Sequence, residues 1–234
     1  MLHPVKEIFT DFISLVYPGI CAACNNALLK NEQSICTHCM FHLPKTNYHL
    51  NNDNPVNKLF WGRVNINAAA SFYLYTKGGK VQNLIHSLKY NGQTDVGTVA
   101  GEWYGYELQS SEEFKNIDLI VPVPLHKKRL KKRGYNQSDF FALGLSKSLA
   151  VIVESNNMIR KENSSTQTKR SRYARWTNVS DLFEVSEPAK FENKHILLVD
   201  DVVTTGSTLE ACAGEILKIA NTKVSIATIA YAHM

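Results

Sequence analysis

The sequence of 234 residues has no apolar run approaching the roughly 18 residues that a membrane-spanning helix needs. Near the amino terminus, Lys6, Glu7 and Asp11 interrupt the apolar positions, so we expect no secretory signal peptide. Internal repeats are absent as well. With 44% hydrophobic residues, the chain has enough apolar material for one medium domain, or for a domain with a small appendage. We therefore predict a cytoplasmic protein with no membrane insertion.

An excess of positive charge is absent from most of the chain. The formal net charge is +5, but six cationic residues fall within 127–133, KKRLKKR, and without them the balance would be −1. Such a run is compatible with a solvated charged loop. It also attracts phosphates, whether a pyrophosphate in a pocket or the backbone of a nucleic acid. The sequence alone leaves these alternatives open.

Cysteine is scarce, with five residues, yet four of them form two C-x-x-C pairs. The four are Cys21, Cys24, Cys36 and Cys39. Each C-x-x-C turn presents two thiolates toward one point, so the two pairs predict a closed, structural zinc site in a segment too small to fold unaided. Redox motifs or unrelated thiols are the alternatives. His38 and His42 could replace a cysteine ligand, but we expect them to be ordinary surface residues. Cys212 is expected to be a small apolar residue of the core.

Apolar periodicity predicts strands and helices in alternation from about residue 66. Expected strands lie at 68–75, 117–124, 196–199 and 224–232, and expected helices at 81–88, 95–109, 140–149 and 209–219. This alternation predicts an α/β domain over 66–234, with a mostly parallel sheet and helices on both faces. An amphipathic helix over 5–16 and a zinc-ribbon-like module make up an amino-terminal region, 1–50. The composition then becomes rich in Asn, and 51–65 is predicted as a linker.

The segment 195–209, HILLVDDVVTTGSTL, combines three features of a ligand site. Residues 196–199 form an apolar run typical of a central parallel strand. Asp200 and Asp201 follow at its carboxyl end, where ligands bind in open α/β sheets. The turn before the next helix consists of Thr204, Thr205, Gly206, Ser207 and Thr208. Free amides at such a helix start form a phosphate nest, so the segment predicts a site for a ribose 5-phosphate.

Simpler interpretations of this segment exist. Paired acids can end a solvated strand, and such a turn can merely cap a helix, although the two halves together favour a site. The phosphoacceptor pocket of receiver domains also has two acids after a strand. That pocket needs a further Asp downstream, and no Asp follows Asp201.

The segment from Val199 to Thr208 resembles the signature of type I phosphoribosyltransferases. That signature is a hydrophobic strand, two acids, two apolar residues and a T-x-G-x-T-like turn. The resemblance implies that Asp200 and Asp201 are the catalytic acids and hold the ribose hydroxyls of 5-phosphoribosyl pyrophosphate (PRPP). It implies that the turn from Thr204 to Thr208 holds the 5′-phosphate, and that Mg²⁺ accompanies PRPP.

Two further segments extend this resemblance. Residues 118–138, DLIVPVPLHKKRLKKRGYNQS, lie where phosphoribosyltransferases carry their pyrophosphate loop. Residues 165–183, STQTKRSRYARWTNVSDLF, resemble the lid of glutamine amidophosphoribosyltransferases, with a Q-x-x-R-like spacing. The implied pyrophosphate and lid contacts are Arg129, Arg133, Gln167, Lys169 and Arg170.

The cysteine pairs, the basic segment, the lid and the acid pair with its turn occur in the order typical of the ComF (competence protein F) family, which this chain resembles. The resemblance implies a phosphoribosyltransferase acting on an unidentified acceptor with release of pyrophosphate, in a family associated with DNA uptake. The alternative is an accessory protein that binds single-stranded DNA or a competence helicase-like partner, with a regulatory or vestigial PRPP pocket. The chain has no glutaminase domain, so ammonia release from glutamine is not expected.

Overall fold

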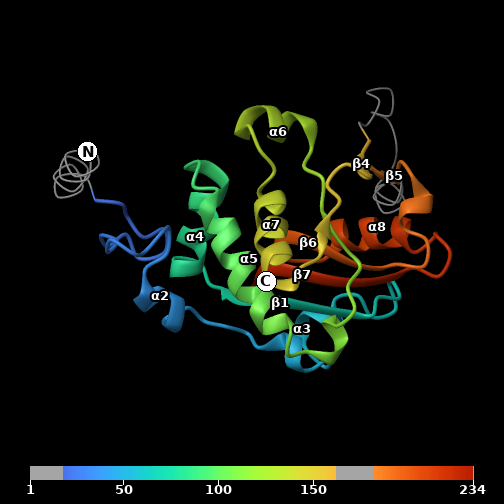
Figure 1. The fold of residues 1–234 in the computed structure, drawn as a ribbon, viewed down its shortest axis with the longest axis horizontal. Coiled ribbons are helices and arrows are strands. Elements are labelled where there is room, and N and C mark those ends of the chain that lie inside the picture. Colours follow the sequence, from blue (N-terminus) through green and yellow to red (C-terminus); the bar gives the residue numbers. More distant parts are fainter. Residues whose placement is uncertain (1–17, 162–181, 234) are drawn as a thin grey trace, which may run out of the picture.

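The computed structural model describes residues 18–161 and 182–233, and a five-stranded sheet forms the centre of this part of the chain (Figure 1). Its strands are β1 (Ala68–Tyr75), β2 (Leu119–Pro122), β3 (Ile152–Val153), β6 (His195–Val203) and β7 (Lys223–Ala232). The spatial order is β1-β7-β6-β2-β3, and every neighbouring pair is parallel. The predicted mostly parallel sheet is confirmed.

Helices cover both faces of the sheet. On one face lie α4 (Lys80–Tyr90), α5 (Asp95–Leu108) and α7 (Gln137–Leu149), and on the other lie α3 (Pro55–Lys58) and α8 (Ser207–Ile216). Along β6, Leu197 and Val199 enter the core with α4, α5 and α7, while Ile196 and Leu198 enter the core with α8. This alternation explains the unbroken apolar run, because successive side chains of a strand point to opposite faces.

Helices α5 and α7 approach each other closely enough to require glycine. A Cβ atom on Gly101 would lie 2.3 Å from the carbonyl oxygen of Phe141. On the facing helix, a Cβ on Gly144 would lie 2.1 Å from the carbonyl oxygen of Thr98. The close packing fixes α7, whose amino end reaches the candidate site described below.

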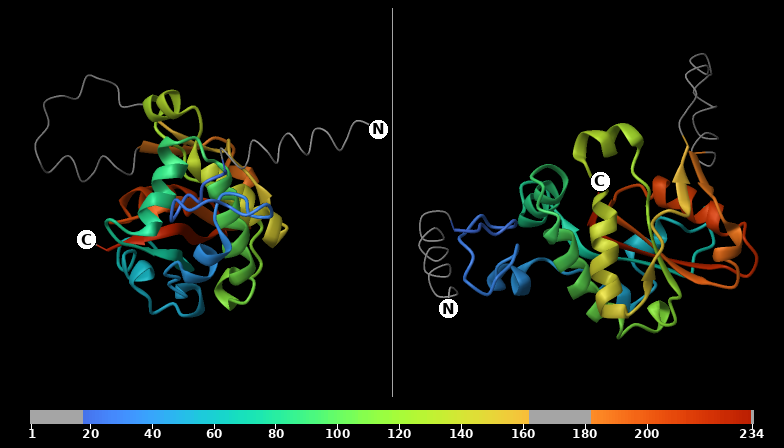
Figure 2. Two further views of the ribbon diagram at one scale, coloured as in Figure 1. Left: turned by 90° about the vertical axis from the view of Figure 1, so that its left-hand side faces the viewer. Right: turned by 45° about the horizontal axis from the view of Figure 1, so that its top comes forward.

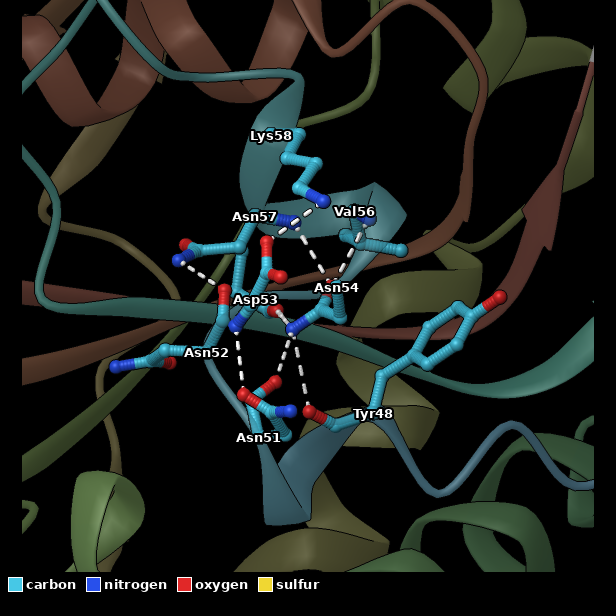
Figure 3. Close-up of polar contacts among 9 residues, drawn as sticks. Tyr48, Asn51, Asn52, Asp53, Asn54, Val56, Asn57 and Lys58 are labelled. Carbon is cyan, nitrogen blue, oxygen red and sulfur yellow. Dashed lines mark hydrogen bonds and ion pairs between the residues drawn. The ribbon is translucent and has the colours of Figure 1, made fainter.

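Residues 51–65, which the sequence predicts as a linker, are folded against β1 (Figure 3). Asn54 is 3% exposed, and its Nδ2 donates to the carbonyl oxygens of Tyr48, Asn51 and Ala69. Its Oδ1 accepts from the backbone amides of Val56 and Asn57, the first turn of α3. The asparagines of this segment therefore cap a helix and bind neighbouring backbone carbonyls, whereas composition alone predicts a linker.

Several shorter elements complete the described chain. They are α2 (Thr37–His42), η1 (Tyr48–Leu50), η2 (Glu112–Phe114), α6 (Lys127–Arg133), η5 (Pro188–Lys190) and the antiparallel pair β4 (Met158–Arg160) and β5 (Phe183–Val185). The predicted helix at 5–16 and the lid residues Gln167, Lys169 and Arg170 lie outside the described residues. Within 18–161 and 182–233, no helix has the length and apolar character required to cross a bilayer.

Candidate functional site

The two acids predicted from the sequence lie near the carboxyl end of β6, in unequal environments. Asp200 is partly buried, and its Oδ1 accepts hydrogen bonds from Ser138 Oγ and from the amide of Asp201, both at 2.8 Å. Asp201 is only 4% exposed, and Lys89 Nζ lies 2.9 Å from its Oδ2. Ser138 is in the first turn of α7 and Lys89 in the last turn of α4, so both helices contribute to the acid pair.

Burial of this acid pair has an electrostatic consequence. Desolvation, followed by the adjacent negative charge of Asp201, raises the pKa of Asp200 from 3.8 to about 7. The hydrogen bonds from the Asp201 amide and from Ser138 act in the opposite direction, as does the charge of Lys89. The free protein therefore holds a carboxyl group that ionises near neutral pH. Hydrogen-bond donors or cations from a ligand would favour its charged form.

The turn after β6 is fixed by two neighbouring residues. Gly206 has φ +75°, and a Cβ at this position would also lie 3.1 Å from Cε1 of Phe60. Arg63 donates through NH1 to the carbonyl oxygen of Thr205 at 2.8 Å and forms an ion pair with Glu210 of α8. The turn from Thr204 to Thr208 and Asp200 line one small recess at the amino end of α8. Such a recess suits an anion, because backbone amides and the helix dipole are directed toward it.

A larger pocket of about 800 Å³ adjoins the acid pair. Its lining includes both acids, Thr208 and five cationic side chains: Lys89, Arg129, Lys132, Arg133 and Arg160. The cations come from α4, α6 and β4, so segments far apart in sequence meet here. Five positive and two negative groups leave an excess of positive charge, which favours a multiply charged anion.

The structure brings most of the predicted site residues together. Both acids, the turn and the two arginines predicted from the basic run line these adjoining cavities. Sequence reasoning missed Lys89, Ser138, Arg160 and Arg63. Ser138 ends the segment 118–138, but the resemblance assigns it no role. The other three residues lie in or beside elements that have no motif, so only the fold identifies them.

The basic run forms helix α6 instead of an open loop. The His126 side chain caps it by accepting from the amide of Lys128 at 3.1 Å, and Gly134, with φ +85°, ends it. Arg133 donates to Gln137 Oε1, and its guanidinium lies 5.6 Å from the ring centroid of Tyr90. The helix has no buried residue and projects from the domain (Figures 1 and 2).

The four predicted cysteine ligands form one cluster. Their Sγ atoms all lie within 4.8 Å of one another, and Cys24 Sγ is 3.7 Å from Cys36 Sγ. Four thiolates around zinc at ~2.3 Å would be ~3.8 Å apart, so the spacing fits a tetrahedral metal site. The amide of Cys36 also donates to Cys21 Sγ at 3.3 Å, a contact that stabilises a thiolate. The arrangement of these four thiols is therefore suited to a structural metal ion.

The surroundings of the cluster agree with a structural role. Cys21 and Cys39 are fully buried, in the same core as α4 and α5. The module lies beside these helices in both views (Figures 1 and 2). Among the described residues, no histidine joins the cluster, and His38 and His42 stack on each other at 4.2 Å. Cys212 is fully buried in the core with α8, as predicted.

Comparison with known protein families identifies the class of this domain. The family described as phosphoribosyl transferase domain matches residues 137–233, from α7 through the last strand. With the parallel sheet and its covering helices, this match defines a phosphoribosyltransferase-like protein. Among solved structures, the glutamine PRPP amidotransferase from B. subtilis has a TM-score of 0.43 and 17% identity, over 62% of this chain and 30% of that chain.

Several proteins named for DNA utilization or competence are similar to this chain in sequence. The DNA utilization protein YhgH of Escherichia coli (strain K12) is 29% identical over 210 residues, 88% of this chain and 87% of that protein. Competence protein F of Haemophilus influenzae is 31% identical over 121 residues, 51% of this chain and 53% of that protein. Competence protein ComFC of Bacillus subtilis (strain 168) is 24% identical over 140 residues, 60% of this chain and 55% of that protein. These similarities support the resemblance to the ComF family that the sequence motifs predict.

Proposed function

We propose that this protein binds PRPP together with Mg²⁺ and transfers its phosphoribosyl group to an acceptor, with release of pyrophosphate. One observation carries the proposal: the acid pair, the helix-start turn and five cations line two adjoining cavities at one edge of the sheet. A ribose bearing one phosphate and one pyrophosphate presents hydroxyls and anionic groups in a matching arrangement.

Each part of the site has a role in this proposal. Asp200 and Asp201 accept hydrogen bonds from the ribose hydroxyls, and charged acceptors make the stronger bonds. The turn from Thr204 to Thr208 holds the 5′-phosphate with its amides and hydroxyls. Arg129 and Arg133 meet the pyrophosphate, as do the lid residues Gln167, Lys169 and Arg170.

The reaction makes few covalent demands on the protein. The bond between ribose C1 and the pyrophosphate oxygen breaks, and its electron pair leaves with pyrophosphate. A lone pair of the acceptor forms the new bond to C1, and the acceptor then loses a proton. The site lowers the barrier by positioning the ribose and stabilising the leaving anion. Mg²⁺, held largely by substrate oxygens and water, neutralises charge on the pyrophosphate.

We assign zinc as the metal of the cysteine cluster, held by Cys21, Cys24, Cys36 and Cys39. Four thiolates leave no open coordination position, so the ion has a structural role. The cysteines share a core with α4, and zinc binding therefore stabilises the side of the domain that contributes Lys89.

A second candidate function is nucleic-acid handling in the cytoplasm, with PRPP as a regulatory ligand. One observation favours it: Lys128 and Lys131 are exposed on α6 and are not among the residues lining the pocket. Relatives are named for DNA utilization and competence. Single-stranded DNA and a competence helicase-like protein are the corresponding partners, since exposed cations bind a phosphate backbone.

Titration calorimetry with PRPP, with and without Mg²⁺, tests the main proposal. We expect binding that requires Mg²⁺ and is lost in the double variant Asp200→Asn/Asp201→Asn. The variant Lys147→Met is the control, because Lys147 is exposed on α7 and does not line the pocket. Unchanged PRPP affinity in the double variant would refute the ribose assignment. Binding of single-stranded DNA, with no binding of PRPP, would favour the second candidate.

A further inference from the structure

The carboxyl end of α4 forms a wall of the large pocket that the sequence does not predict. Lys89 and Tyr90, the last two residues of the helix, both line it. Tyr135 Oη donates to the carbonyl oxygen of Leu88 at 2.6 Å and thereby ties the helix end to the chain after α6. Arg133, at the end of α6, lies over the ring of Tyr90. The end of α4 is therefore fixed in place beside the pocket cations.

The ion pair between Lys89 and Asp201 is strongly desolvated. The Asp201 side chain is 5% exposed and the Lys89 side chain 23% exposed. Removing one partner of such a pair leaves an uncompensated charge, whereas removing both is often tolerated. Lys89 is the partner that remains open to solvent through the pocket. Its ammonium has three donors, and one carboxylate oxygen engages only part of that capacity.

We propose that Lys89 is a ligand-contacting residue, oriented by Asp201, whose ammonium binds the pyrophosphate group of PRPP. The inference rests on the proposed function and deepens it. Asp201 Oδ2 holds the lysine, and Oδ1 receives a ribose hydroxyl. In Asp200, Ser138 and the Asp201 amide occupy Oδ1, which leaves Oδ2 for the ligand. Each acid then presents one oxygen to the ribose.

The location of Lys89 indicates contact with the pyrophosphate group and not with the 5′-phosphate. The recess at the helix-start turn is lined by Asp200 and by residues 202–209, and Lys89 is not among them. The larger pocket contains Lys89 together with Arg129, Arg133 and Arg160. The lysine therefore belongs to the cationic end of the site, where the leaving group would lie.

Three probes separate the parts of the site: PRPP, ribose 5-phosphate, and pyrophosphate with Mg²⁺. For Lys89→Met we expect the affinity for PRPP and for pyrophosphate to fall about tenfold to a hundredfold, since a hydrogen bond to a charged group contributes about 1.5–3 kcal/mol. The affinity for ribose 5-phosphate should stay within about twofold. Lys89→Arg should retain most of the pyrophosphate affinity, and Lys147→Met all of it.

A loss of equal size for pyrophosphate and ribose 5-phosphate would overturn the inference, because Lys89 would then act only as a counter-ion. If Lys89→Met does not fold, the comparison is made between Asp201→Asn and the double variant Lys89→Met/Asp201→Asn. Neither of these variants leaves the Asp201 carboxylate buried without its lysine. The double variant should bind pyrophosphate more weakly than Asp201→Asn, and equal affinities would refute the role. Failure of the wild-type protein to bind any of the three probes would instead refute the proposed function.

Discussion

Replacing Asp200 with Asn should stabilise the free protein and abolish its response to PRPP. The wild-type carboxyl is partly buried beside Asp201, and its pKa is raised to about 7. Because this folded-state pKa exceeds the unfolded-state value, folding favours the protonated acid. The contribution of Asp200 to the unfolding free energy is therefore most favourable below about pH 4 and is lost as the pH rises to about 7. An asparagine amide at this position does not ionise, so the variant lacks this loss.

The magnitude follows from the size of the shift. A rise of the pKa from 3.8 to about 7 corresponds to roughly 4 kcal/mol when Asp200 is fully ionised, at ~1.4 kcal/mol for each pH unit. Solvent in the pocket screens the charge, and we expect about 1–3 kcal/mol in practice. For a domain of this size, that difference raises the Tm by roughly 3–10 °C.

The assay is thermal unfolding of both proteins between pH 5 and pH 8. The stability advantage of Asp200→Asn should grow up to about pH 7 and then become constant. A saturating mixture of Mg²⁺ and PRPP should raise the Tm of the wild type only, because ligand binding to the folded state adds about 2.7 kcal/mol at 100 times Kd. An advantage that is the same at pH 5 and pH 8, or a variant less stable at pH 8, would refute the electrostatic reasoning.

Three further outcomes are expected. Gly101→Ala should lower the unfolding free energy by several kcal/mol, because the added Cβ would overlap the carbonyl oxygen of Phe141. The control Gly214→Ala, whose Cβ would have no atom within 4 Å, should be neutral or stabilising, and equal effects of the two substitutions in denaturant titrations would contradict the packing of α5 against α7. Elemental analysis should find one zinc per chain, and its removal by a chelator should lower the Tm; an unchanged Tm would exclude a structural role. Replacing Lys128 and Lys131 with Gln should weaken any binding of single-stranded DNA. The slope of log affinity against log salt concentration should fall by ~0.7 for each phosphate that is no longer neutralised, and the PRPP affinity should not change. A fall in PRPP affinity would instead assign this face of α6 to the pocket.

The central part of the site could be predicted because it is continuous in sequence. The strand, the acids and the turn between Ile196 and Thr208 follow one another, so their arrangement requires only local geometry. Gly206 illustrates this point. A glycine in this turn predicts a tight bend, and in the structure Gly206 has a left-handed backbone with φ +75°. The contact that excludes a Cβ, from Phe60, depends on the fold and could not be predicted.

Two of the cations that line the pocket, Lys89 and Arg160, could not be predicted in the same way. Lys89 follows Leu88 on an amphipathic helix, where the apolar pattern assigns it to a polar face and nothing more. Arg160 ends a strand of three residues, too short for a periodicity to be recognised. Both line the pocket together with the acid pair because the fold brings α4 and β4 to the edge of the sheet where β6 ends. The local sequence around each of these segments does not predict that they lie close together in the fold.

The basic run shows how one local assignment changes a functional prediction. As a loop, its six charges would be equivalent, and only the family resemblance singles out Arg129 and Arg133. On a helix, the charged residues are distributed over different faces, because residues three and four apart share a face. Arg129, Lys132 and Arg133 lie on one face and line the pocket, while Lys128 and Lys131 lie on another face and do not line it. The same seven residues therefore present charge to a small anion on one side and to solvent on the other, so pocket binding and nucleic-acid binding can be tested by separate substitutions.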